Sequence, residues 1–205
     1  MSIHPPWHAL ILAGGRSRRM GRDKAQLPWQ GGTLLDHLID VLHRAGASGV
    51  QIAGLQPDGR GIPDRWPGIG PLGGLASALP EVEDGALLVL PVDLPLLEAD
   101  LLAPLLVHPN AAAVRFRAQP MPLRLRVDAA LRAEVESLLG AEPAQRSMNT
   151  LFSRLKGIEI ECPESLSGAL LNCNTPQDWQ AALQTQSLSH SEEGGRTSTS
   201  PSSRK

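Results

Sequence analysis

The sequence Leu10-Ile-Leu-Ala-Gly-Gly-Arg-Ser-Arg-Arg-Met-Gly-Arg-Asp-Lys24 begins as a short apolar run, stops at two glycines and continues as a strongly basic segment. Gly14 and Gly15 let backbone N–H groups come close to a ligand, because glycine has no Cβ. Successive N–H groups in such a turn form a concavity that suits an anion. Positive side chains then follow at Arg16, Arg18, Arg19, Arg22 and Lys24. The stretch therefore predicts a strand followed by a polyphosphate-binding loop, which is typical of an enzyme that handles nucleotides.

Apolar stretches bounded by glycine or proline alternate with segments of helical spacing along the rest of the chain. The stretches that predict strands are Trp7–Leu12, Gly49–Ala53, Ala86–Leu90, Ala111–Val114 and Gly157–Glu161. Helices are predicted at Thr33–Ala45, Leu72–Leu79, Glu98–Val107 and Val127–Leu139, and from Thr175 to about Gln184. Strands that alternate with helices favour an α/β fold of three layers, with a mainly parallel sheet that is covered on both faces.

The length of 205 residues suits one domain with a short appendage. We expect the domain to span residues 1–184. Residues 185–205 are rich in Ser and Thr, have few apolar side chains and are predicted to form a disordered tail. Aromatic residues make up only 3% of the chain, so aliphatic side chains must build the core.

Charge and cysteine content exclude several classes of protein. The formal net charge of −2 argues against general nucleic-acid binding, so the basic segment is local and suits a small anion. No apolar run approaches the ~20 residues of a membrane-spanning helix. Cys162 and Cys173 lack the spacing of a redox pair, and no signal peptide precedes them. We therefore expect a cytoplasmic protein with reduced thiols.

A carboxylate follows the buried strand in Leu87-Leu-Val-Leu-Pro-Val-Asp-Leu-Pro95. Ligands of such sheets bind at the carboxyl ends of the strands, so we expect Asp93 and the Gly14 loop at the same edge. Proteins usually bind Mg²⁺ through one or two carboxylates together with substrate phosphates and water. Asp93 is therefore a candidate Mg²⁺ ligand, and the alternative is a turn or capping residue.

Asp64 precedes a glycine-rich loop, Pro67-Gly-Ile-Gly-Pro-Leu-Gly-Gly74. The glycines permit close backbone approach to a base or a ribose. A carboxylate can accept hydrogen bonds in pairs from the N1 and N2 donors of guanine. Asp64 is therefore a candidate nucleotide contact, and the alternative is an ordinary loop that leads into the next helix.

Together these elements resemble the molybdenum cofactor guanylyltransferases, the MobA family of the nucleotidyltransferase superfamily. The resemblance extends over about residues 7–184 and includes the ending Asn172-Cys-Asn-Thr-Pro-Gln-Asp178. It implies a Rossmann-like nucleotidyltransferase fold. The activity that it implies is transfer of GMP from GTP to the terminal phosphate of molybdopterin, with Mg²⁺ as cofactor and pyrophosphate as the second product. Transient contact with other proteins of molybdenum cofactor synthesis is a further implication.

The resemblance also assigns roles to individual residues. Arg19, Lys24 and Asp93 form the catalytic set, in which Arg19 and Lys24 hold the triphosphate and Asp93 holds the metal. Asn172 and Asn174 would lie near the metal and the acceptor phosphate, and the sequence does not choose between them. The nucleotide-binding residues that it implies are Leu12, Ala13, Gly14, Gly15, Lys24, Asp64 and Asp93.

Two stretches depart from the family pattern. Members often have an asparagine after the second strand that reaches the nucleotide, whereas this chain has Gln51-Ile-Ala-Gly-Leu-Gln56. Residues 115–149 match only loosely, although Pro120-Met-Pro-Leu-Arg124 is similar to the strand on the pterin side of the family's site. The alternatives are a molybdopterin cytidylyltransferase, another nucleotidyltransferase, or a non-catalytic nucleotide-binding regulator. A metal carboxylate disfavours the regulator, because binding alone does not require one.

Overall fold

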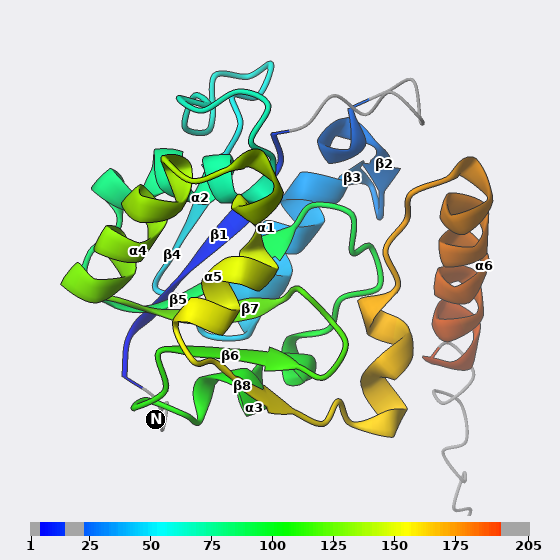
Figure 1. The fold of residues 1–205 in the computed structure, drawn as a ribbon. Helices are drawn as coiled ribbons and strands as arrows, with labels where there is room; N and C mark the ends of the chain where they lie inside the picture. The colour runs from blue at the N-terminus through cyan, green and yellow to red at the C-terminus, as the bar shows by residue number, and fades with distance from the viewer. Residues whose placement is uncertain (1–4, 15–22, 194–205) are drawn as a thin grey trace, which may run out of the picture.

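The structure is a computed structural model that describes residues 5–14 and 23–193. Its main feature is a six-stranded sheet with the strand order β4-β1-β5-β7-β6-β8 (Figure 1). β1 lies parallel to both β4 and β5, and β6 lies parallel to β8, whereas β7 is antiparallel to its two neighbours. The sheet is therefore mostly parallel, as predicted. The strands are β1 (Trp7–Leu12), β4 (Gly49–Ala53), β5 (Gly85–Pro91), β6 (Ala113–Phe116), β7 (Leu123–Val127) and β8 (Ile158–Ile160).

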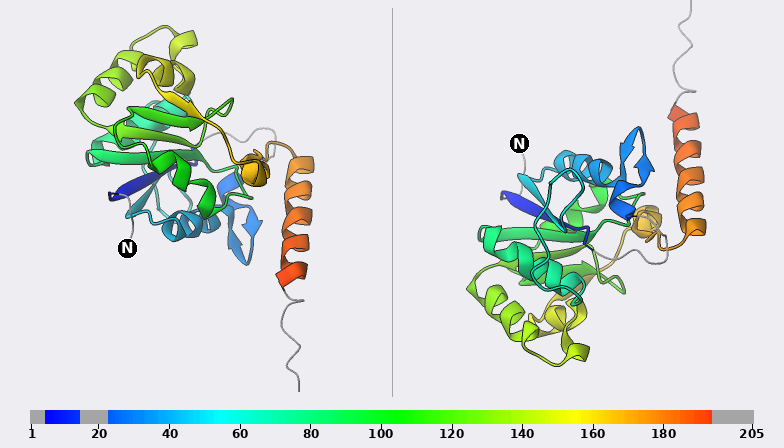
Figure 2. Two further views of the ribbon diagram at one scale, coloured as in Figure 1. Left: turned by 90° about the horizontal axis from the view of Figure 1, so that it is seen from below. Right: turned by 90° about the horizontal axis from the view of Figure 1, so that it is seen from above.

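Helices cover both faces of this sheet and give the three layers that the sequence predicts (Figure 2). Side chains of α1, α3 and α6 join one apolar cluster, which includes Leu35, Leu105 and Ala182. Side chains of α2, α4 and α5 join the cluster on the other face, which includes Leu75 and Leu151. The helices are α1 (Leu34–Arg44), α2 (Pro71–Ala78), α3 (Ala103–Leu106), α4 (Ala129–Leu139), α5 (Met148–Arg154) and α6 (Pro176–Glu193).

Local sequence explains why β1 is a central strand and why α1 begins at Leu34. In β1, Ala9 and Ile11 belong to one cluster while Leu10 and Leu12 belong to the other, so the central strand is apolar on both faces. α1 begins with a capping box: the Thr33 hydroxyl accepts from the Asp36 N–H at 3.1 Å. The Asp36 carboxylate accepts in return from the Thr33 N–H at 3.3 Å.

Several predicted elements differ from the structure. The helix predicted at 98–107 is divided into a 3-10 turn, Ala99–Leu101, and the four-residue α3. Pro104 has no N–H, so it cannot continue a helical ladder from the preceding turn. β7, α5 and the small hairpin of β2 (Pro28–Trp29) and β3 (Gly32–Thr33) were not predicted as regular elements.

The predicted end of the last helix near Gln184 is wrong, because α6 continues to Glu193. Two hydroxyl groups of this extension bond to the preceding helical turn: Thr185 Oγ1 donates to the Ala181 carbonyl at 3.1 Å, and Ser187 Oγ donates to the Leu183 carbonyl at 2.9 Å. Residues 185–193 of the predicted disordered tail are therefore helical, and the expected boundary at 184 falls within α6. Residues 194–205 lie outside the described residues.

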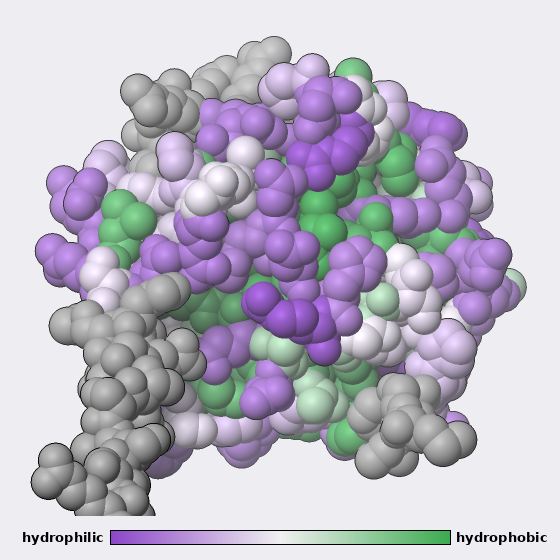
Figure 3. All heavy atoms as spheres, turned by 180° about the vertical axis from the view of Figure 1, so that it is seen from behind, coloured by the Kyte–Doolittle hydropathy of each residue, from purple (hydrophilic) through white to green (hydrophobic). Residues whose placement is uncertain are grey.

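The face seen from behind is mostly hydrophilic, and smaller groups of hydrophobic residues lie between the polar ones (Figure 3). Within residues 5–14 and 23–193, none of the helices combines the length and the apolar character that crossing a lipid bilayer requires.

Candidate active site

The carboxyl ends of β1, β4 and β5 meet at one edge of the sheet, as the sequence predicts. Leu12 is in register with Ala53 of β4 and with Pro91 of β5. Beyond the strands, the Ala13 N–H donates to the Ala53 carbonyl at 2.9 Å, and the Val92 N–H donates to the Leu12 carbonyl at 3.2 Å. Asp93 therefore follows a strand end directly beside the one that leads into Gly14.

The backbone of Ala13, one of the predicted nucleotide-binding residues, is already hydrogen-bonded within the sheet edge. Its N–H donates to the Ala53 carbonyl, so it is not free to hold a phosphate. Ala13 and Leu12 instead line the pocket described next. Gly14 lines it too, whereas the predicted contacts Gly15 and Arg19 lie outside the described residues.

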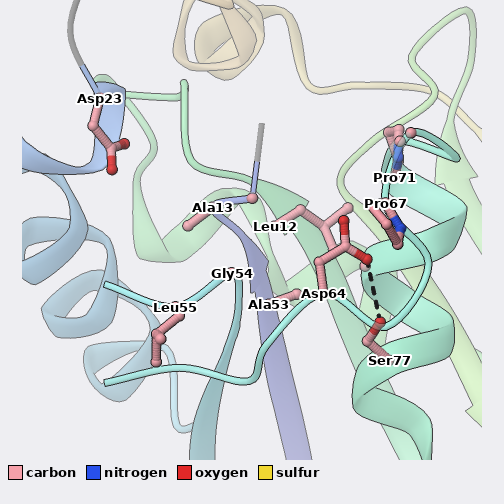
Figure 4. A pocket seen from close by; sticks show the side chains of 14 residues that line it. Leu12, Ala13, Asp23, Ala53, Gly54, Leu55, Asp64, Pro67, Pro71 and Ser77 are labelled. Carbon is pink, nitrogen blue, oxygen red and sulfur yellow. Dashed lines mark hydrogen bonds between the residues drawn. The ribbon is translucent and has the colours of Figure 1, made fainter. Parts of the chain in front are cut away.

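A pocket of about 810 Å³ opens at this edge of the sheet, between the strand ends and the first turn of α2 (Figure 4). Its volume is typical of a small-molecule site. Among the described residues no side chain caps the first turn of α2, which begins after Gly70, and the positive end of this helix lies at the pocket wall. The residues that line the pocket include Gly14, Asp23, Gly54, Leu55, Asp64 and Ser77.

Two glycines let the pocket walls approach each other. Gly54 has a φ of +111°, and a Cβ there would lie 2.5 Å from the Gly14 nitrogen. A Cβ on Gly74 of α2 would lie 3.1 Å from Leu12 and 3.4 Å from Ala53. The glycine-rich loop thus has a packing role, because it seats α2 against the ends of β1 and β4.

Asp64, the predicted nucleotide contact, lies on the wall of the pocket. Its Oδ1 accepts from the Trp66 N–H at 2.9 Å and faces the Ser77 hydroxyl at 3.5 Å (Figure 4). The Ser77 hydroxyl also lies 2.8 Å from the Gly73 carbonyl, which is the better acceptor by distance. Among the described residues Asp64 Oδ2 accepts no hydrogen bond, so this oxygen is available to a ligand.

A second cluster, formed by Lys24, Asp93 and Asn174, brings three distant segments together. Lys24 Nζ lies 2.9 Å from Asp93 Oδ2 and 2.8 Å from Asn174 Oδ1. Lys24 begins a short 3-10 turn that Asp23, a residue of the pocket wall, caps through its carboxylate. The side chains of Lys24 and Asp93 are only 14% and 17% exposed, so their ion pair is largely shielded from water. Of the two candidate asparagines, Asn174 makes this contact and Asn172 does not.

The segment that carries Asn174 is held at both ends. The Cys173 N–H donates to the Asp93 carbonyl at 2.9 Å. On the other side Asp178 Oδ2 accepts from the N–H groups of Asn174 at 2.9 Å and Thr175 at 2.8 Å. Hydrogen bonds from Thr175, and a further one from the Asn174 backbone, hold the pKa of the Asp178 carboxyl below its ordinary value. Asp178, which lies in the first turn of α6, therefore also positions the backbone of Asn174.

The cluster suits a divalent cation because two of its oxygen atoms point to one position. Asp93 Oδ2 and Asn174 Oδ1 converge on one cationic atom, the Lys24 nitrogen, so two hard oxygen donors already share a position for positive charge. Within the described part of the chain, His, Cys, Asp and Glu side chains form no group of three or more that could hold a metal. The residues thus fit Mg²⁺ bound by few protein ligands and completed by phosphates and water.

Sequence reasoning missed Gly54, Leu55, Gln56 and Ser77. The available signal was their position, since Gly54 directly follows a predicted strand and Ser77 lies one helical turn after Gly73. Leu55, which lines the pocket, is 61% exposed. Gln56 and Ser77 are among the few buried polar residues of the described region.

The strand order, with a pocket at the carboxyl ends of β1, β4 and β5, fits a nucleotidyltransferase fold, and solved structures agree. The molybdopterin-guanine dinucleotide biosynthesis protein A of Archaeoglobus fulgidus superposes with a TM-score of 0.69 at 20% identity, covering 88% of this chain and 99% of that one. The 2-C-methyl-D-erythritol 4-phosphate cytidylyltransferase of Thermus thermophilus gives 0.63 at 19% identity, covering 86% and 97%. Both likenesses show the fold alone.

The family follows from the sequence comparisons. The family model described as a MobA-like NTP transferase domain matches residues 9–156, and the chain belongs to this family. It is 42% identical to a molybdenum cofactor guanylyltransferase of Xanthomonas euvesicatoria, over 89% of this chain and 97% of that relative. A second one, of Ectopseudomonas mendocina, is 34% identical over 86% and 92%. The predicted family and fold are thereby confirmed.

Proposed function

We propose that this protein transfers GMP from GTP to the terminal phosphate of molybdopterin, and that the products are the guanine dinucleotide form of the cofactor and pyrophosphate. The observation that carries the proposal is the 42% identity to a guanylyltransferase over 89% of the chain. The pocket with Asp64 and the cluster of Lys24, Asp93 and Asn174 supply groups that suit this reaction.

The chemistry needs no activated side-chain nucleophile. An oxygen of the acceptor phosphate, already anionic at neutral pH, attacks the α-phosphorus of GTP and forms the new P–O bond. The bond from that phosphorus to the bridging oxygen breaks, and its electron pair leaves with pyrophosphate. The protein therefore contributes positioning and stabilisation of charge. In this scheme Lys24 exchanges its carboxylate partner for the departing pyrophosphate, whose negative charge increases as the bond breaks.

The metal proposal follows from the same cluster. Asp93 and Asn174 would hold Mg²⁺, which when bound supplies neutralisation of phosphate charge. Asp178 holds the backbone of Asn174 in place by accepting a hydrogen bond from the Asn174 N–H. We assign guanine recognition to Asp64, whose Oδ2 could accept from the base. Gly15 and Arg19 keep their sequence-based assignments on the phosphates, and Asn172 keeps its assignment on the acceptor side.

One assay tests the reaction. Pyrophosphate release would be measured with each of the four nucleoside triphosphates and Mg²⁺, with and without molybdopterin. We expect release with GTP, and only when molybdopterin is present. Release with CTP instead of GTP would identify a cytidylyltransferase, and no release with any triphosphate would favour a nucleotide-binding regulator. A cytoplasmic setting and transient contacts with other proteins of cofactor synthesis are further parts of the proposal.

A further inference from the structure

Gln56 is a buried polar residue whose side chain connects two parts of the site. It is 4% exposed, and both ends of its amide are hydrogen-bonded. Gln56 Nε2 donates to the Gly54 carbonyl at 2.8 Å, and Gln56 Oε1 accepts from Gln26 Nε2 at 3.2 Å. A buried amide left without hydrogen-bond partners is destabilising, so these two bonds define the orientation of the side chain.

The two partners of Gln56 belong to different halves of the site. Gly54 and Leu55 line the pocket that Asp64, the residue assigned to the base, also lines. Gln26 ends the 3-10 turn that begins at Lys24, the residue assigned to the phosphates. A single side chain therefore links two halves of the site, which are the pocket wall and the turn that carries Lys24.

Residues 54–62 form the loop that follows β4, and their other hydrogen bonds do not reach the turn at Lys24. The Gly54 N–H donates to Ile62 and the Gln56 N–H donates to Arg60, both within the loop. Arg60 forms an ion pair with Asp36 of α1 at 2.8 Å. Among the described residues, the bond between Gln56 and Gln26 is thus the direct hydrogen bond from this loop to the turn that carries Lys24.

We propose that Gln56, through Gln26, is a positioning residue that keeps the pocket wall in register with Lys24, so that a nucleoside triphosphate is bound at both ends at once. The inference rests on the proposed function. The physical reason is that a displacement of about 1 Å between two binding groups lowers the affinity for any ligand that must contact both. A ligand that occupies only one half needs no such register.

Equilibrium binding of three probes distinguishes ligands that contact both halves of the site from ligands that contact one half. GTP spans both halves, GMP lacks the two outer phosphates, and pyrophosphate lacks the nucleoside. Calorimetry would be carried out on the full chain with Gln26→Leu, which breaks the link and leaves the bond from Gln56 to Gly54 intact. We expect the GTP affinity to fall about tenfold, while the affinities for GMP and pyrophosphate change less than twofold. Gln56→Leu should have a similar effect, and the double variant should be no worse than the stronger single variant.

Gln51→Leu is the matched control, because Gln51 lies on β4 and donates its amide to the Glu81 carbonyl away from the pocket. It should leave all three affinities unchanged. An equal loss of GTP, GMP and pyrophosphate binding in Gln26→Leu would overturn the proposal, since that result indicates general loosening. Unchanged GTP binding would overturn it as well. If Gln56→Leu does not fold, Gln26→Leu decides alone, because Gln26 is only half-buried. Binding affinities are measured without turnover. A negative result in the transfer assay would therefore count against the proposed function and not against the role of the bond between Gln56 and Gln26.

Discussion

Lys24 Nζ lies 2.9 Å from Asp93 Oδ2, although 69 positions separate the two residues in the sequence. Asn174 Oδ1 lies 2.8 Å from the same nitrogen. The lysine ammonium and a bound Mg²⁺ would therefore compete for the same two oxygens. Competition of this kind ties metal binding to the arrival of a polyphosphate, which offers the ammonium another partner.

Replacing Lys24 tests this competition. Lys24→Met removes the positive charge and keeps an unbranched apolar side chain, so Mn²⁺ should bind the nucleotide-free protein about tenfold more tightly. The affinity for GTP should fall, because the same side chain is assigned to the phosphates. Electron paramagnetic resonance of free Mn²⁺ measures the first effect and calorimetry the second. Lys156→Met, at an exposed lysine, is the control. Unchanged Mn²⁺ binding in Lys24→Met would refute the competition.

Asp93→Asn tests the metal assignment directly. The amide keeps the shape of the side chain and loses its charge, so Mn²⁺ binding should become undetectable. Turnover should fall by about 10²–10³, the loss expected when one preorganised electrostatic group is removed. The measurement is pyrophosphate release at saturating Mg²⁺. Asp100→Asn, at an exposed aspartate on the 3-10 turn that follows, should retain full activity. Near-normal turnover of Asp93→Asn would exclude a metal role for Asp93.

A third prediction concerns Gly54, where backbone conformation and close packing coincide. Gly54→Ala places a Cβ in a left-handed conformation, which costs about 1–2 kcal/mol, and also 2.5 Å from the Gly14 nitrogen. Gly59→Ala has the same conformational cost at a φ of +84°, but nothing lies within 4 Å. Urea unfolding should therefore show a larger loss of stability for Gly54→Ala, and GTP affinity should fall only in that variant. Equal losses in the two variants would mean that the contact with Gly14 contributes nothing.

A fourth prediction concerns acid stability. The hydrogen bond from Thr33, with a further contribution from Arg60, lowers the pKa of Asp36 below its ordinary 3.8. A carboxyl whose pKa is lowered by folding stabilises the protein above pH 3.8, and this contribution disappears as the pH falls through the lowered pKa. Asp36→Asn should thus be less stable than the parent at pH 7 and should lose less stability on acidification to about pH 3. Urea midpoints at both pH values measure this, with Asp40→Asn on the exposed face of α1 as the control.

The sequence alone determined the parts of this protein that depend on neighbours in the chain. The apolar run of β1, the capping box at Thr33 and Asp36, and the glycine-rich loop before α2 are local patterns, and the structure contains each of them. The motifs around Lys24, Asp64 and Asp93 also indicated the correct family, because their order and spacing along the chain are distinctive. The helix end near Gln184 was predicted wrongly, because a Ser- and Thr-rich composition does not by itself end a helix, and α6 continues to Glu193.

Only the tertiary structure decided which residues meet. The antiparallel entry of β7, the contact of Asn174 with Lys24 across 150 positions, and the link from Gln56 to Gln26 depend on the order of strands in the sheet. No periodicity records such contacts, because a hydrogen bond between distant side chains imposes no pattern on the residues around it. The sequence therefore predicted the chemical groups of the candidate site, while the packing of the sheet decided which of them lie together.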